Sequence, residues 1–196
     1  MADPISNSFA GLPEIIRSFI AVPIPDEVLA QLSGIQQQLK RKFQKVSWTR
    51  PTAMHLTLQF LGDIKSTRLP ELMSVMSDAT RELSAFDVEL SGVGSFGNRV
   101  LWVGVKRGVE PLTFLANALR RATKGFGDHD EERAFSAHVT LGRCRTPARD
   151  AGKILSEVTV PRLTPWRVDD CELIRSEPSP QGSRYTTLAR FPLRAD

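Results

Sequence analysis

Apolar residues follow two periods along this chain of 196 residues, and each period predicts one kind of element. Alternation of apolar and polar residues, or a short apolar run between turn residues, predicts strands at 15–22, 54–62, 86–96, 100–105, 135–143, 166–177 and 185–193. Apolar residues three or four positions apart predict helices at 26–43, 67–83, 112–124 and between 147 and 158. Gly97 and Asn98 are expected to form a hairpin turn, and Asp26 is placed to cap the first helix.

The order of these elements predicts an α+β fold. Strands and helices do not alternate regularly, as they would in a doubly wound sheet, so mixed or antiparallel sheets with helices on their outer faces are expected. Residues 1–14 mix Pro, Ser, Asn and Gly and are expected to form a flexible N-terminal extension. No linker rich in Gly or Ser divides the remainder, so residues 15–196 are expected to form one bilobal domain.

One four-residue pattern occurs in two of the predicted strands, as His55-Leu56-Thr57-Leu58 and His138-Val139-Thr140-Leu141. Alternate side chains of a strand point to opposite faces, so each copy places its His and Thr on one face and its aliphatic residues toward a core. The chain has only 3 His, and two of them lie in this pattern, which argues against incidental histidines. With one copy in each half, the pattern suits two pseudo-symmetric lobes with a central cleft.

Two facing His-x-Thr strands could catalyse displacement at a phosphodiester or cyclic phosphate. In-line attack at phosphorus puts the entering and leaving oxygens on opposite sides, where a neutral His can remove one proton and a protonated His can supply another. Imidazole titrates near pH ~6.5, so both states are accessible. Thr57 and Thr140 can each donate a hydrogen bond to a non-bridging phosphate oxygen. This chemistry requires no metal and no other cofactor.

Two residues near the pattern are candidate substrate ligands. Arg143 could bind phosphate, although strict alternation turns it away from His138 unless the strand contains a bulge. Phe60 could stack on a base. By alternation, however, Phe60 belongs to the aliphatic face and Gln59 to the face of His55, and core packing is the more common role of a strand Phe.

A metal site is the rival interpretation of the histidines. Zinc catalysis usually uses three protein ligands, and neither His55 nor His138 has a His-x-His or His-Glu-x-x-His partner. His129 lies between Asp128 and Asp130 and could be a ligand, but a solvated role is more common for a histidine in such a loop. The motifs of a serine nucleophile or a glycine-rich phosphate loop do not occur.

Composition adds little to this picture. There are 26 Lys and Arg against 22 Asp and Glu, and the net charge of +4 suits an anionic partner such as a nucleic acid. Cys144 and Cys171 lack CxxC spacing and suggest no disulfide scaffold, and Cys144 is expected to be a core residue. The absence of a long apolar run or secretory signal leads us to expect a cytoplasmic protein.

In these motifs the sequence resembles the 2H phosphoesterase superfamily, and within it the bacterial and archaeal RNA 2′,3′-cyclic phosphodiesterases, historically described as 2′-5′ RNA ligases. The resemblance covers nearly the whole chain and rests on an opening strand at 17–22, on 48–51 with 55–62, on 135–143 and on a closing hairpin at 173–193 that contains Ser176, Gly182 and Tyr185. Ala137 stands where the family often has Pro before the second His, a departure that affects entry into the strand and not the chemistry.

The resemblance implies a bilobal α+β fold with the histidines facing each other across the cleft. It also implies metal-independent hydrolysis of RNA 2′,3′-cyclic phosphate ends to 2′-phosphomonoesters, with weak 2′-5′ ligation as the reverse reaction. His55 would be the general acid for the departing 3′ oxygen and His138 the base that activates water, while Thr57 and Thr140 hold the phosphate. The residues alone do not decide which His is the acid. The implied partners are RNA with such ends, tRNA fragments among them, or nucleotide 2′,3′-cyclic phosphates, bound by a monomer.

Two alternatives stay open. The same chemistry could act on a small cyclic nucleotide or on an ADP-ribose cyclic phosphate. A non-catalytic RNA-binding module could also use the basic cleft, with the histidines as contacts only. Turnover of an oligonucleotide with a 2′,3′-cyclic phosphate end distinguishes these possibilities.

Overall fold

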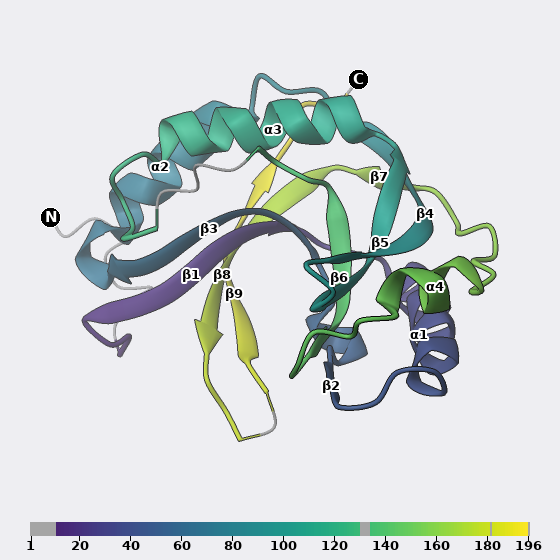
Figure 1. Cartoon of the computed structure of the whole chain (residues 1–196). Coiled ribbons are helices and arrows are strands. Elements are labelled where there is room, and N and C mark those ends of the chain that lie inside the picture. Colours follow the sequence, from purple (N-terminus) through teal and green to yellow (C-terminus); the bar gives the residue numbers. More distant parts are fainter. Residues whose placement is uncertain (1–10, 130–133, 181, 196) are drawn as a thin grey trace, which may run out of the picture.

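An antiparallel sheet of nine strands forms the frame of the described residues (Figure 1). The computed structural model describes residues 11–129, 134–180 and 182–195. In chain order the strands are β1 (Ile15–Val22), β2 (Val46–Trp48), β3 (Leu56–Lys65), β4 (Phe86–Phe96), β5 (Val100–Arg107), β6 (His138–Cys144), β7 (Trp166–Val168), β8 (Asp170–Glu177) and β9 (Arg184–Pro192). Their order across the sheet is β7-β4-β5-β6-β3-β1-β8-β9, and β2 pairs with β6.

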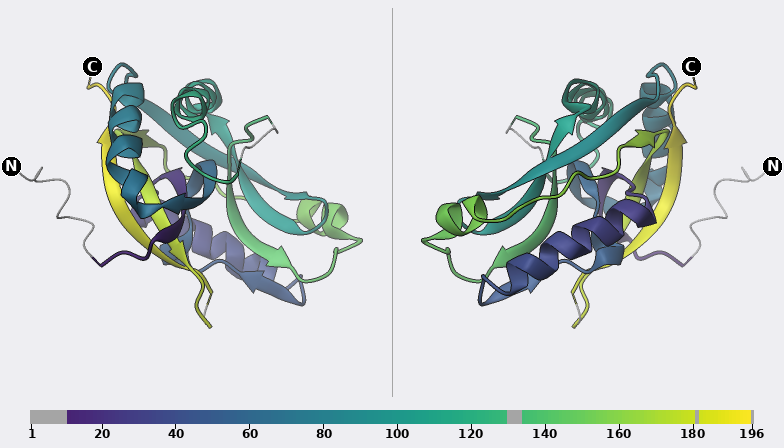
Figure 2. Two further views of the ribbon diagram at one scale, coloured as in Figure 1. Left: turned by 90° about the vertical axis from the view of Figure 1, so that its left-hand side faces the viewer. Right: turned by 90° about the vertical axis from the view of Figure 1, so that its right-hand side faces the viewer.

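This strand order interleaves the two halves of the chain. β8 and β9 come last in the sequence, but β8 pairs with β1; β2 comes early, but it pairs with β6. Neither half of the chain can therefore complete its own part of the sheet. The sheet is strongly curled, with β8 and β9 on one side and β4 and β5 on the other (Figure 2).

In the described part of the chain, four helices accompany the sheet: α1 (Asp26–Lys40), α2 (Leu69–Thr80), α3 (Val109–Ala122) and α4 (Ala151–Ser156). Short 3-10 turns, η1 (Pro51–Ala53) and η2 (Ser66–Arg68), precede β3 and α2. α2 and α3 pack against each other across the upper part of the sheet in Figure 1 and contact β9 and β3, respectively. The helices bury their apolar stripes against the sheet in one main core, which includes Leu32 and Ile35 of α1 and Leu115 of α3. Among the described residues, no helix is long and apolar enough to cross a membrane.

The two strands that carry the His-x-Thr pattern are neighbours in the sheet. β3 and β6 pair at Leu56 and Val139 only, while the rest of β3 pairs with β1 and the rest of β6 pairs with β2 and β5. His55 and His138 directly precede the two paired residues. The antiparallel pairing therefore brings both histidines to the joint between the halves of the sheet.

The α+β class and most of the predicted elements are confirmed. β1 has the predicted bounds, and both Gly97 and Asn98 adopt the positive φ expected of a hairpin turn. Two details are wrong. Asp26 is the first residue of α1 and makes no capping bond, because Pro25 occupies the capping position. The strand expected at 166–177 divides into β7 and β8, which pair with β4 and β1 in different parts of the sheet. Most of the expected N-terminal extension, residues 1–10, lies outside the described residues.

The loop after α3 is attached to β3 by close backbone contact. The Asp63 N–H donates to Asp128 Oδ1 over 2.7 Å, and the His129 N–H donates to the Leu61 carbonyl over 3.3 Å. Gly127 lies so close to β3 that a Cβ on it would be 1.8 Å from the carbonyl oxygen of Leu61. These contacts hold Asp128 and His129 beside β3.

We expect Gly127→Ala to destabilise the fold by about 1–3 kcal/mol, because the added methyl group must push the loop away from β3. Gly34→Ala is the matched control: Gly34 lies exposed within α1, no atom lies within 4 Å of its added Cβ, and alanine should stabilise that helix by up to ~1 kcal/mol. Urea denaturation measures both free energies of unfolding. Equal stability of the two variants would contradict the close contact.

Candidate active site

A cavity of about 120 Å³ lies at the joint between β3 and β6. Thr49, Ala53 and Tyr185 form part of its lining. The rest consists of the six residues predicted from the sequence, which are His55, Thr57, Phe60, His138, Thr140 and Arg143. Two larger cavities, of about 430 Å³ and 350 Å³, adjoin it and share Phe60 and Arg143 with it. The structure therefore brings all the predicted site residues together.

A bulge in each of the two strands interrupts the alternation of side chains. In β3, Thr57 pairs with Ala21 and Gln59 with Ile20, so Leu58 is an extra residue. In β6, Thr140 pairs with Trp102 and Gly142 with Leu101, so Leu141 is likewise extra. A bulge shifts the following side chains to the opposite face of the strand. The residue five positions after each His consequently joins the His on the cavity face.

These bulges decide where the two further candidates lie. Arg143 was expected on the face of His138 only if the strand contains a bulge. The bulge at Leu141 is present, and Arg143 lines the cavity. For Phe60, strict alternation gives the wrong face: the residue is 42% exposed and lines the cavity. Gln59, expected beside His55, is instead buried and accepts a 3.0 Å hydrogen bond from the Thr123 hydroxyl. Phe60 and Arg143 thus occupy equivalent positions in the two copies of the pattern.

Both catalytic candidates present the same ring nitrogen for proton transfer. His55 Nδ1 lies 2.9 Å from the carbonyl oxygen of Ala53, and His138 Nδ1 lies 2.7 Å from that of Ser136. A carbonyl oxygen can only accept a hydrogen bond, so each Nδ1 must carry its proton. The nitrogen that can gain or lose a proton is therefore Nε2 in both rings. Two copies of the pattern give two imidazoles with the same tautomer.

Aromatic side chains surround His55 and control its charge. Phe19 stacks on the imidazole with ring centroids 4.6 Å apart, and Tyr185 meets it edge-on at 5.3 Å. Burial lowers the pKa of His55 to about 4, against the opposing effect of the Ala53 carbonyl, and the charges of His138 and Arg143 also lower it. In the free protein His55 is consequently neutral at pH 7.

Sequence reasoning missed the aromatic residues that support the two histidines. Phe19 and Tyr185 contact His55, and Phe96 meets His138 edge-on with ring centroids 4.9 Å apart. Alternation in β1 places Phe19 on the face opposite the buried Ile20, but nothing local shows that this face meets a histidine from another strand. The only feature of the sequence that pointed to Tyr185 was its place in the closing hairpin of the family resemblance.

A buried glutamine of α1 holds the bulge of β6 in place. Gln36 is 2% exposed, and its amide donates to the carbonyl oxygens of Leu141 over 2.9 Å and Thr49 over 2.7 Å. Leu141 is the extra residue of the bulge, and its carbonyl also accepts the Thr49 N–H over 2.9 Å. Gln36 therefore supports the backbone that directs Arg143 into the cavity.

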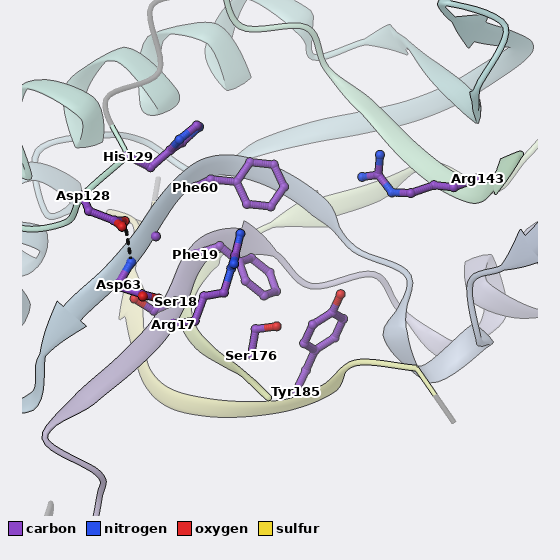
Figure 3. A pocket seen from close by; sticks show the side chains of 11 residues that line it. Arg17, Ser18, Phe19, Phe60, Asp63, Asp128, His129, Arg143, Ser176 and Tyr185 are labelled. Carbon is purple, nitrogen blue, oxygen red and sulfur yellow. Dashed lines mark hydrogen bonds between the residues drawn. The ribbon is translucent and has the colours of Figure 1, made fainter. Parts of the chain in front are cut away.

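Charges around the cavity favour an anion. No carboxylate among the residues that the structure describes forms an ion pair with Arg143, and two imidazoles and two threonine hydroxyls face the same space. No group of three or more His, Cys, Asp or Glu side chains in the described ranges could hold a metal ion. His129 lines the 430 Å³ cavity with Asp63 and Asp128 (Figure 3), while Asp130 lies outside the described residues.

We expect Gln36→Leu to weaken the binding of inorganic phosphate about fivefold, because the loss of its hydrogen bonds loosens the bulge that places Arg143. Gln31→Leu is the matched control, since Gln31 lies on the same helix and its amide bonds Thr164 instead. Calorimetric titration with phosphate compares the two. If both variants bind phosphate equally well, Gln36 does not position Arg143.

Known proteins resemble this chain in both sequence and fold. The family model of LigT-like phosphoesterases matches residues 22–102. An RNA 2′,3′-cyclic phosphodiesterase of Methanothermobacter thermautotrophicus is 32% identical over 186 residues, which cover 91% of this chain and 99% of that protein. The enzyme of the same name from Thermus thermophilus is 30% identical over 190 residues, with 92% of each chain covered.

Solved structures agree with these sequence matches. A crystal structure of a Thermus thermophilus protein superimposes with a TM-score of 0.75 at 31% identity and covers 92% of this chain and 100% of its own. E. coli LigT complexed with 3′-AMP gives a TM-score of 0.75 at 25% identity over 92% of this chain and 99% of that one. The chain therefore belongs to the LigT-like phosphoesterases of the 2H superfamily.

Proposed function

We propose that this protein hydrolyses the 2′,3′-cyclic phosphate ends of RNA to 2′-phosphomonoesters without a metal ion. The observation that carries the proposal is the cavity at the β3–β6 joint, which is lined together by His55, His138, Thr57, Thr140 and Arg143. The names of the relatives, RNA 2′,3′-cyclic phosphodiesterases, support the substrate class.

In the proposed reaction, water attacks phosphorus as the bond from phosphorus to the 3′ oxygen breaks. His138 Nε2 accepts a proton from the attacking water, and His55 Nε2 gives a proton to the departing 3′ oxygen. Thr57, Thr140 and Arg143 stabilise the charge on the non-bridging oxygens. The product carries a 2′-phosphate and a free 3′-hydroxyl. If an RNA 5′-hydroxyl takes the place of water in the same displacement, the product is a 2′-5′ phosphodiester, which would account for weak 2′-5′ ligation.

His55 can act as the acid only if the substrate changes its charge state. Burial keeps its pKa well below its ordinary value in the free protein. An anionic phosphate next to Nε2 favours the protonated imidazole and raises that pKa. We therefore infer that His55 takes up a proton when the cyclic phosphate binds. His138, which contacts Phe96 and lies half-buried, acts as the base on the opposite side.

The nucleotide part of the proposal has support of its own. E. coli LigT was crystallised in complex with 3′-AMP, a nucleoside monophosphate. The exposed ring of Phe60 beside the histidines could stack on a base. We infer that RNA ends such as tRNA fragments, or nucleotide 2′,3′-cyclic phosphates, are the partners, and that a monomer acts on them in the cytoplasm.

We expect His55→Asn and His138→Asn each to lower kcat on an oligonucleotide with a 2′,3′-cyclic phosphate end by about 10²- to 10⁴-fold, because each removes one proton-transfer group. Wild-type activity should survive excess chelator. Steady-state assays with circular dichroism as the folding control measure both effects. Full activity in either variant, or loss of wild-type activity with EDTA, would refute this mechanism.

We expect the pKa of His55 to be about 4 in the free protein and to rise by at least ~1 unit on saturation with inorganic phosphate. The measurement is an NMR titration of the imidazole resonances, assigned with His55→Asn. A pKa that phosphate leaves unchanged would exclude His55 as the acid.

The same pKa shift also predicts a pH dependence of stability. An unfolded imidazole titrates near ~6.5, so the stability that neutral His55 gives is complete above that pH and is lost as the pH falls toward about 4. The loss is at most about 1.4 kcal/mol per pH unit, and His55→Asn should remove it. Urea unfolding between pH 4 and pH 7 compares the two proteins.

A further inference from the structure

We propose that the 430 Å³ cavity binds the nucleotide that precedes the cyclic phosphate, so that the preferred substrate has at least two nucleotides. This inference rests on the proposed function. The cavity shares Phe60, Arg143 and Tyr185 with the smaller cavity that contains the histidines. Arg17 and Phe19 of β1 form another part of its wall (Figure 3).

The size of the smaller cavity requires the rest of the substrate to lie elsewhere. Sites for whole small molecules usually measure about 300–1,000 Å³, whereas the cavity of the histidines measures about 120 Å³. It suits the cyclic phosphate itself. The adjoining 350 Å³ cavity is lined in part by polar residues such as Arg120 and Arg143, and the rest of its lining, which includes Phe96 and Phe135, offers apolar surface for a base. The 430 Å³ cavity on the other side is polar and has a cationic side chain, which suits the sugar-phosphate chain.

Arg17 supplies a second cationic group in addition to Arg143. It lies on the cavity face of β1, four residues from Ala21, which pairs with Thr57. At about 3.3 Å per strand residue, the backbone of Arg17 is ~13 Å from that pair. Arg17 and Arg143 point into the cavity from opposite sides, with Phe60 between them (Figure 3).

A second phosphate fits these two arginines. Among the described residues, neither Arg17 nor Arg143 forms an ion pair with a carboxylate. Because the backbone of Arg17 lies ~13 Å from the Ala21–Thr57 pair, a phosphate held by the histidines and Arg143 would leave Arg17 for another anion. Arginine binds phosphate oxygens in a bidentate fork. The nearest further anion of an RNA end is the phosphate that links the last two nucleotides.

The remaining lining suits the uncharged parts of a nucleotide. Phe60 and Tyr185 provide ring surfaces on which a base could stack. Asp63 and Asp128 also line the cavity, and their carboxylates repel a phosphate but accept hydrogen bonds from hydroxyl and amino groups. A lining that combines a cation, aromatic rings and carboxylates matches a nucleotide better than a free inorganic anion.

The test compares two substrates that differ by one nucleotide. We expect kcat/KM on the ApA dinucleotide with a 2′,3′-cyclic phosphate to exceed that on 2′,3′-cyclic AMP by about tenfold or more, as one charge-assisted contact would give. Arg17→Met, which keeps the aliphatic stem, should bring this ratio close to one. Arg107→Met is the matched control: Arg107 is an exposed strand residue paired with Asp87, and its loss should leave the ratio at the wild-type value.

Salt dependence separates a phosphate contact from a structural role. The reaction product, ApA with a 2′-phosphate, is titrated into each protein at several salt concentrations. Arg17→Met should lower the slope of log Kd against log salt by about 0.7, the contribution of one phosphate contact to a single strand. Arg17→Lys keeps the positive charge and should restore most of the slope. If Arg17 had only a structural role, the salt slope would not depend on whether residue 17 carries a positive charge.

Three results would overturn the inference, and they differ in what they say about the proposed function. If the wild-type protein hydrolyses both substrates with a ratio near one, or if Arg17→Met leaves the ratio unchanged, the cavity is not a nucleotide subsite, while the proposed function stands. If neither cyclic phosphate is hydrolysed, the proposed function fails and the inference fails with it.

Discussion

Backbone pairing between Leu56 and Val139 joins the two halves of the sheet, and both histidines directly precede this pair. Because β3 and β6 pair nowhere else, a small cavity remains at the joint. The bulges at Leu58 and Leu141 then add one more side chain to each copy of the pattern. A short pairing and two extra residues thus convert two amphipathic strands into a site with two imidazoles, two hydroxyls, a guanidinium and an aromatic ring.

Burial of His55 couples the protonation of its imidazole to the binding of an anionic ligand. Phe19 and Tyr185 exclude water from the imidazole and favour its neutral form. Binding of an anion and uptake of a proton at Nε2 then favour each other, since each stabilises the other's bound state. In the proposed mechanism the free protein has a neutral His55, and the protonated form that acts as the acid arises in the complex. The hydrogen bond from Nδ1–H to the Ala53 carbonyl fixes the tautomer of the neutral ring and can hold the ring orientation in both charge states.

Sequence reasoning succeeded where the argument depends on local period and failed where it depends on pairing between strands. The faces of His55, Thr57, His138 and Thr140 follow from alternation within each strand. The face of Phe60 does not, because the bulge at Leu58 is visible only in the register with β1. The division between β7 and β8 and the support of Leu141 by Gln36 likewise depend on contacts between residues far apart in the chain. Tyr185 lies in β9, far in sequence from the strands that carry His55 and His138. The local pattern around Tyr185 therefore could not place it in their cavity.

Proton transfer by two histidines on opposite sides of one phosphate is the central claim. The most direct test is the pH dependence of kcat/KM for a 2′,3′-cyclic phosphate oligonucleotide, measured in excess chelator. An acid and a base that act together predict a bell-shaped profile, with one limb for each imidazole. A profile that lacks either the acidic or the basic limb would contradict the account.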